Sequence, residues 1–264
     1  MMMDTAVTAL AFSRDSEMIA SGSHDGSISL WKVQTGSLVR SIPKAHAQGV
    51  TSLCFSRDGS QILSASFDTT VRMYGLKSGK VMREFRGHTS FVNDVSFSVD
   101  GSRVISASSD GTVRVWDARS SECLAALRPR HGASDTATVA APSVSAAIAL
   151  PRNPEHLLVV DRTNELSVMS TRGQALATLA ATNPDSSVVD AHFLAAAVSF
   201  RGQYAFAAAE DNKLYCFNLE TNKLDFVLPV HTTKEIVGVT AHPHMPLVVT
   251  YSTDGTLRAW KAAA

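Results

Sequence analysis

Short apolar runs recur along the chain in groups of four, with the period of β-strands. In the first run of a group, apolar side chains alternate, as at Leu10 and Phe12, while Val7 lies at an odd offset before them. An odd offset inside an alternating strand indicates a β-bulge, because one extra residue reverses the side-chain parity. The same pattern recurs at Val50, Leu53 and Phe55 and at Val92, Val95 and Phe97. Each group is therefore predicted to begin with a bulged strand.

The other three runs of a group complete an antiparallel sheet. The second run is small and β-branched, as in 104–107, and the third ends in an aromatic residue, as in 113–116. An Asp-Gly pair between these two runs predicts a tight hairpin. The fourth runs are 38–42, 81–85 and 224–228. Four short antiparallel strands in repeated groups predict an all-β propeller.

The hairpin motif returns at a nearly constant interval. Its copies are SGSHDGSISLW (21–31), SASFDTTVRMY (64–74), SASSDGTVRVW (106–116) and TYSTDGTLRAW (250–260), with weaker copies TNELSVM (163–169) and DNKLYCF (211–217). Asp25, Asp68 and Asp110 lie 43 and 42 residues apart. A period of about 40–45 residues ending in an aromatic, with Gly-His upstream, resembles WD40 repeats. One propeller domain over 1–264 is expected, with units near 6–44, 45–86, 87–130, 139–180, 189–229 and 230–264.

Composition narrows the function classes. Lys plus Arg equals Asp plus Glu at 24 each, so bulk charge does not favour a nucleic-acid or anionic-membrane binder. Cys54, Cys123 and Cys216 fall on predicted strands of different units, which favours reduced thiols inside a cell. No apolar stretch is long enough to cross a bilayer. The segment 128–147 is rich in Ala, Ser and Thr and is predicted to be an extended loop.

A histidine, a hydroxyl, an aspartate and an aromatic residue recur at fixed offsets. The sets are His46, Ser64, Asp68 and Tyr74; His88, Ser106, Asp110 and Trp116; and His231, Thr250, Asp254 and Trp260. A catalytic triad is needed once per active site, whereas a set repeated in several units indicates a local hydrogen-bond network. We therefore expect structural tetrads, and none in the fourth unit, where Val159, Thr163 and Met169 stand at equivalent positions.

Other candidate chemistry is weak. His242-Pro243-His244 resembles a pair of metal ligands, but it lies at a predicted turn without a third ligand nearby in sequence. There is no phosphate-binding glycine loop and no Cys-x-x-Cys motif. The sequence predicts no catalytic, cofactor-binding or metal residues, and therefore a protein that is not an enzyme.

Several stretches outside the general repeat resemble the Smu-type (suppressor of mec and unc) spliceosomal proteins. They include FSRDSEMIASGSHDGSISLWKVQTG, LPRNPEHLLV, AEDNKLYCF, AHPH and TYSTDGTLRAWK. The segments 151–156 and 241–244 are the most diagnostic, because an ordinary WD40 blade has an Asp-Gly turn there. The resemblance runs along essentially the whole chain.

The resemblance implies a nuclear, non-catalytic scaffold for protein partners in pre-mRNA splicing. The resemblance implies a domain order in which a Lis-homology module is followed by a seven-bladed propeller. This chain is expected to hold six of the seven blades and to be truncated at the N-terminus. The implied partners are spliceosomal proteins, among them the RED splicing protein, although the N-terminal module carries much of that partnership in the family. The resemblance implies no cofactor.

Two other functions remain open. The sequence Trp116-Asp117-Ala118-Arg119 has the Trp-Asp-x-Arg form of propellers that act as substrate receptors on cullin-4-type ubiquitin ligases. Trp-Asp is, however, ordinary repeat consensus. Direct RNA binding is disfavoured, because arginines are spread over all units with matching acids.

The residues before the hairpin aspartates and beside the strand bulges are predicted to face one end of the propeller and to contact partners. These residues are His24, Phe67, Ser109, Arg162, Glu210 and Thr253 at the turns, and Phe91, Asn93, Gly49, Thr51, Glu235 and Val237 at the bulges. Phe67 and Phe91 stand out, because apolar rings in loops suit a contact hot spot. The alternative is that they pack against a neighbouring blade.

Overall fold

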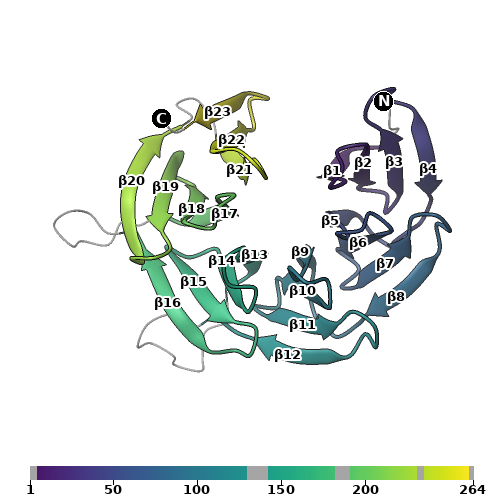
Figure 1. The fold of residues 1–264 in the computed structure, drawn as a ribbon, viewed down its shortest axis with the longest axis horizontal. Coiled ribbons are helices and arrows are strands. Elements are labelled where there is room, and N and C mark those ends of the chain that lie inside the picture. The colour runs from purple at the N-terminus through teal and green to yellow at the C-terminus, as the bar shows by residue number, and fades with distance from the viewer. Residues whose placement is uncertain (1–4, 130–141, 182–190, 231–234, 262–264) are drawn as a thin grey trace. The chain divides into compact units, whose positions relative to one another are not determined.

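The computed structural model describes residues 5–129, 142–181, 191–230 and 235–261, and these form six antiparallel sheets (Figure 1). None of the described residues belongs to a helix able to cross a membrane. The chain divides into two compact units, Met1–Leu127 and Arg128–Ala264, each contributing three of the sheets. The predicted all-β propeller with six blades is confirmed.

The first unit contains three four-stranded sheets, each in the order of its strands along the chain. Their strands are β1 (Val7–Phe12), β2 (Met18–Ser23), β3 (Ile28–Lys32) and β4 (Leu38–Ile42); β5 (Val50–Phe55), β6 (Gln61–Ser66), β7 (Val71–Gly75) and β8 (Val81–Phe85); and β9 (Val92–Phe97), β10 (Arg103–Ser108), β11 (Val113–Asp117) and β12 (Cys123–Leu127). Within this unit, β1, β5 and β9 lie on the inner side and β4, β8 and β12 on the outer side (Figure 1).

The second unit contains two four-stranded sheets and one three-stranded sheet among its described residues. Their strands are β13 (Val144–Ala149), β14 (His156–Asp161), β15 (Glu165–Ser170) and β16 (Ala175–Ala180); β17 (Phe193–Val198), β18 (Tyr204–Ala209), β19 (Lys213–Asn218) and β20 (Lys223–Pro229); and β21 (Ile236–Ala241), β22 (Leu247–Ser252) and β23 (Leu257–Lys261). Cys54, Cys123 and Cys216 lie on β5, β12 and β19, as predicted.

The first strand of each sheet carries the predicted bulge. On β5, Val50 pairs with Ser66 and Ser52 with Ala65, so Thr51 is the extra residue. The bulge turns Val50 and Leu53 toward the same side, where both are buried. A strict alternation would have exposed one of them.

The hairpin after the second strand uses a residue with positive φ. Gly26 has φ of 82° and ends a four-residue turn that begins at Ser23, since its N–H donates to the Ser23 carbonyl. In the second sheet the same position is Thr69, which has φ of 69° although it is not glycine. The left-handed conformation is therefore required by the loop and not chosen by the residue.

Neighbouring sheets within a unit pack through mixed apolar clusters. One cluster joins Ile28 and Leu30 of the first sheet to Leu53 of the second. In the second unit, Val160 and Leu166 of one sheet pack with Phe193 of the next. The first strand of each later sheet in a unit thus covers the face of the sheet before it.

One expectation was wrong in part. The low-complexity segment 128–147 was predicted to be a loop, but its end belongs to β13. Val144 and Ala147 are buried there at the spacing of a bulged first strand, so burial of small side chains overrides the loop-like composition. Residues 130–141 lie outside the described part of the chain.

The two turn glycines Gly26 and Gly255 allow a matched test. A Cβ on Gly26 would lie 2.4 Å from the His46 carbonyl oxygen, whereas one on Gly255 would meet nothing within 4 Å. Both residues have positive φ, so either Gly→Ala change should cost about 1–2 kcal/mol. Gly26→Ala should cost about 1–3 kcal/mol more, because its methyl group collides with the backbone of the loop that leads into the next sheet. Denaturant unfolding of the two variants measures this difference, and equal losses would contradict the close approach.

Candidate interaction surface

A hydrogen-bonded chain of four side chains ties the loop before β9 to the third sheet. His88 Nδ1 lies 2.9 Å from Asp110 Oδ2, and His88 Nε2 lies 2.7 Å from Ser106 Oγ. The Trp116 indole N–H donates to the same Ser106 oxygen at 2.8 Å. Three of the four residues are buried, and Asp110 is partly buried. The structure thus brings all four predicted residues together.

The protonation states follow from burial and partners. Burial lowers the pKa of His88 below its ordinary value, against the pull of the Asp110 carboxylate, so the ring is neutral at neutral pH. The Nδ1–H then donates to Asp110, while Nε2 accepts the Ser106 hydroxyl proton. Burial raises the pKa of Asp110, but hydrogen bonds from Thr112 and His88 outweigh it and bring the pKa to about 2.

This arrangement resembles a catalytic triad but cannot act as one. Ser106 is 0% exposed, so no substrate can reach its hydroxyl. Its oxygen also accepts from the indole and its proton is held by His88. A nucleophile needs access to the reacting carbon. The set therefore stabilises the sheet and its incoming loop.

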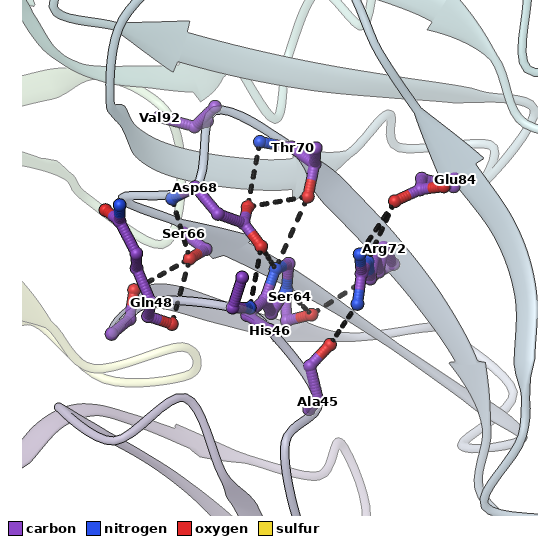
Figure 2. Close-up of polar contacts among 12 residues, drawn as sticks. Ala45, His46, Gln48, Ser64, Ser66, Asp68, Thr70, Arg72, Glu84 and Val92 are labelled. Atoms are coloured by element: carbon purple, nitrogen blue, oxygen red, sulfur yellow. Dashed lines mark hydrogen bonds and ion pairs between the residues drawn. The ribbon is translucent and has the colours of Figure 1, made fainter.

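The second sheet carries the same arrangement with one change (Figure 2). His46 Nδ1 lies 2.9 Å from Asp68 Oδ2, and Nε2 lies 2.8 Å from Ser64 Oγ. Burial raises the pKa of Asp68, but hydrogen bonds from His46 and Thr70 reverse this and hold it well below its usual range. Tyr74 does not join Ser64 as predicted, because its longer phenol reaches past the serine and donates to the Ala45 carbonyl.

The sixth sheet shows part of its predicted set. The Trp260 indole donates to Thr250 Oγ1 at 3.1 Å, and Thr250 is buried. Asp254 is exposed, against the expectation of burial, since it lies in the turn of an exposed hairpin. His231 lies outside the described residues.

The fourth and fifth sheets depart from the pattern. In the fourth, Val159 and Met169 are buried apolar residues in the places of the hydroxyl and the aromatic ring, as expected. In the fifth, the Tyr215 hydroxyl donates to Asp211 Oδ2 at 2.8 Å. Sequence reasoning missed this pair, although an aromatic residue four positions after the turn aspartate was its visible sign.

Phe67 and Phe91 form an aromatic pair in the first unit. Phe67 lies in the β6–β7 turn, and Phe91 lies in the loop before β9, at the end of the unit that also carries the β10–β11 turn. Their ring centroids lie 5.2 Å apart at an interplanar angle of 84°, an edge-to-face contact. Phe91 remains 47% exposed, while Phe67 is half-buried. The rings thus pack across neighbouring sheets, as the alternative expected, and still present apolar surface to solvent.

The backbone holds this aromatic pair in place. The Phe67 N–H donates to the Gly49 carbonyl, and the Phe91 carbonyl accepts from the Ser109 N–H at 2.9 Å. Gly49 leaves room, because a Cβ there would lie 3.1 Å from the His24 carbonyl oxygen and 3.2 Å from the Phe67 ring. His24, Phe67 and Phe91 therefore line one continuous strip, with His24 exposed.

Polar groups border the strip. Asn93 Nδ2 donates to Ser109 Oγ at 2.9 Å, so these two predicted residues also come together. Thr51, on the bulge of β5, donates its hydroxyl to the Val92 carbonyl and thereby ties the second sheet to the third. An apolar centre with a fixed polar border is the usual anatomy of a protein contact.

The remaining predicted contact residues belong to the second unit. Arg162, Glu210, Thr253, Glu235 and Val237 are all exposed, and Val237 is 50% exposed. Glu210 donates its N–H to the His192 carbonyl, and Thr253 does the same to Glu235. No aromatic ring accompanies them at these positions.

The described residues contain no group of three His, Cys, Asp or Glu side chains that could hold a metal. His242 and His244 have ring centroids 6.3 Å apart. The His242 Nδ1 instead accepts the backbone N–H groups of His244 and Met245, at 3.1 Å each. This histidine therefore caps its own turn.

Comparison with known proteins supports a propeller of repeats. The model of the WD domain, G-beta repeat matches residues 36–75, 79–117 and 222–261, and the model of the Vps8 beta-propeller matches residues 3–50. The chain is similar to WD40 repeat-containing protein smu1 of Dictyostelium discoideum, with 39% identity over 179 residues. That match covers 67% of this chain and 32% of the relative, so the chain spans about a third of the relative's length.

Removing the Asp110 carboxylate should destabilise the fold. Asp110→Ala leaves the buried His88 ring without its acceptor, which should cost about 1–3 kcal/mol and lower the melting temperature. Asp58→Ala is the matched control, because Asp58 is an exposed turn carboxylate whose pKa is also about 2, held down by Ser56 and Ser60. Thermal unfolding should show the larger loss for Asp110→Ala, and similar losses in the two variants would contradict the network's role.

Acid should weaken the same network. The pKa of Asp110 is about 2 in the fold and about 4 when unfolded, so its stabilisation is present above about pH 4 and is lost as the pH falls toward 2. Urea unfolding between about pH 5 and pH 2.5 should show a smaller decline in Asp110→Ala than in the unaltered chain. An identical decline in both would show that Asp110 does not contribute.

Proposed function

Because the chain is a WD40-repeat β-propeller of the Smu type, we propose that it is a non-catalytic scaffold that holds protein partners together in the nucleus during pre-mRNA splicing. Its sheets form a rigid frame in each unit, so function is expected on the loops between strands. The absence of any reachable nucleophile among the described tetrads supports binding over catalysis.

The observation that carries this proposal is the aromatic pair of Phe67 and Phe91. An aromatic ring that is 47% exposed costs free energy in water unless a partner covers it. The backbone bonds and the edge-to-face contact keep both rings in place before binding, which lowers the entropy lost on association. Zero formal net charge fits a contact based on shape and apolar area.

The ubiquitin-ligase alternative rests on Arg119. The residue is exposed in the β11–β12 turn, with its N–H bonded to Asp117 Oδ1 at 2.8 Å and its carbonyl accepting from Arg83 at 2.7 Å. These bonds fix the backbone and leave the guanidinium outward. Bonds within the chain are thus enough to account for the conformation of this turn, and Arg119 alone does not favour the ubiquitin-ligase function.

Alanine at both rings should weaken partner binding without unfolding the chain. Tagged chain carrying Phe67→Ala and Phe91→Ala, mixed with nuclear extract, should lose a subset of spliceosomal proteins by about tenfold or more in quantitative mass spectrometry. The control is Leu38→Ala with Val39→Ala, which removes two exposed apolar side chains from β4, 53% and 55% exposed. That control should keep the full set.

Two outcomes would contradict the proposal. Retention of every partner by the Phe67 and Phe91 double variant would show that the strip is not the contact. Capture of a cullin-4 adaptor that is lost on Arg119→Ala, with no spliceosomal protein present, would favour the ubiquitin-ligase function. RED is included among the proteins scored, because the resemblance implies it as a partner.

A further inference from the structure

A pocket of about 660 Å³ opens in the second unit between its last two sheets. One wall comes from β18, β19 and β20 and includes Phe206, Cys216 and Phe226. The other comes from β21, β22 and β23 and includes Ala241 and Trp260. The volume falls within the usual range of ligand pockets, about 300–1,000 Å³.

Part of the pocket lies at Ala241, where the second and third sheets carry a phenylalanine, although the fourth sheet also has an alanine, Ala149, at this register. The last residue of the first strand is Phe55 in the second sheet and Phe97 in the third, and each packs into the cluster with the sheet before it. In the fifth sheet the residue is Val198, which packs in the same way. In the sixth it is Ala241, paired with Val248 at the register that pairs Phe97 with Val104. Relative to the second and third sheets, a methyl group stands in the place of a ring, and Ala241 lines the pocket there.

A second exchange makes the wall apolar. Phe226 pairs with Cys216 at the register where Arg40 pairs with Leu30 and Arg83 with Met73. The two arginines donate to backbone carbonyls of the next sheet's loop, Arg40 to Lys77 and Arg83 to Arg119. Phe226 instead presents a ring that is 45% exposed.

The thiol on the wall adds no charge. Burial, with a smaller contribution from the Asp225 carboxylate, raises the pKa of Cys216 to about 12. Cys216 is therefore a neutral, apolar side chain at physiological pH. The walls as a whole suit a hydrophobic group.

The lining of the pocket includes two exposed cations, one from each sheet. Arg201 lies in the turn between β17 and β18, and Lys261 ends β23. The Arg201 guanidinium lies 5.1 Å from the centroid of the Phe200 ring. Neither cation has an ion pair with a carboxylate within the described ranges of the chain. An acidic ligand would therefore meet two available positive charges.

We propose that this pocket binds a peptide segment of a partner protein that places a large apolar side chain between carboxylates. The apolar group fills the space left at Ala241, and acidic neighbours on either side face Arg201 and Lys261. A lipid acid offers one carboxylate, whereas the two cations stand on separate sheets, so a peptide with acids on both sides fits better. The inference rests on the proposed scaffold function and supplies it with a second contact, separate from the aromatic pair.

Titration of the chain with the hexapeptide Glu-Glu-Leu-Phe-Glu-Glu tests the proposal, with Trp260 in the pocket wall as a fluorescent reporter. The peptide should bind at least about tenfold more tightly than Lys-Lys-Leu-Phe-Lys-Lys. Ala241→Phe should weaken binding by about tenfold or more, because it fills the pocket with the side chain that β5 and β9 already carry. Its melting temperature should not fall.

Arg201→Glu is the second variant and alters only an exposed side chain, so it should fold normally and also lose about tenfold in affinity. Phe67→Ala with Phe91→Ala should leave peptide binding unchanged, which separates failure here from failure of the aromatic contact. Equal binding of both peptides, full binding by Ala241→Phe, or saturation by decanoate without peptide binding would each overturn the proposal.

Discussion

Packing of each sheet against the first strand of the next is the interaction on which each unit depends. An antiparallel sheet with an apolar face needs that face covered, and here the cover is a single bulged strand. On β5, the bulge turns Val50 and Leu53 to the same side, so that both reach the first sheet. Gly22 accepts them closely, because a Cβ there would lie 2.6 Å from the Val50 side chain. Bulge and glycine together set the distance between two sheets.

The hydrogen-bonded tetrads solve a different problem, which is the placement of the loop that leads into each sheet. A loop over a buried edge must satisfy its own polar groups. Asp110 accepts from His88 and from the Thr89 N–H at 3.1 Å, so one carboxylate holds both a side chain and the backbone beside it. Because these loops are fixed, the surface they carry is also fixed, and the aromatic pair can be rigid without lying in a regular strand.

Much of the fold and of the tetrads could be predicted from the sequence, because the same spacing of residues recurs in several repeats. The offsets of His88, Ser106 and Asp110 recur in the second sheet at His46, Ser64 and Asp68, and both sets meet in space. The prediction was wrong where it depended on side-chain length. The Tyr74 phenol reaches beyond Ser64 and donates to the Ala45 carbonyl instead. The strand β13 was missed because alanines carry little strand preference and only burial reveals them. Aligning the repeats shows the small residue Ala241, but it does not show the pocket, whose volume depends on how closely two sheets approach.

The sequence separations of the contacts set an order in which the chain can fold. His88 and Asp110 are 22 residues apart, so that network closes as soon as its own hairpin exists. The hydroxyl of Thr51 and the carbonyl of Val92, which join two sheets, are 41 residues apart. Such contacts are local compared with the length of the chain, and local contacts favour rapid folding. A chain emerging from the ribosome can therefore complete one sheet before the next is made, and each finished sheet offers its open face as the template for its successor.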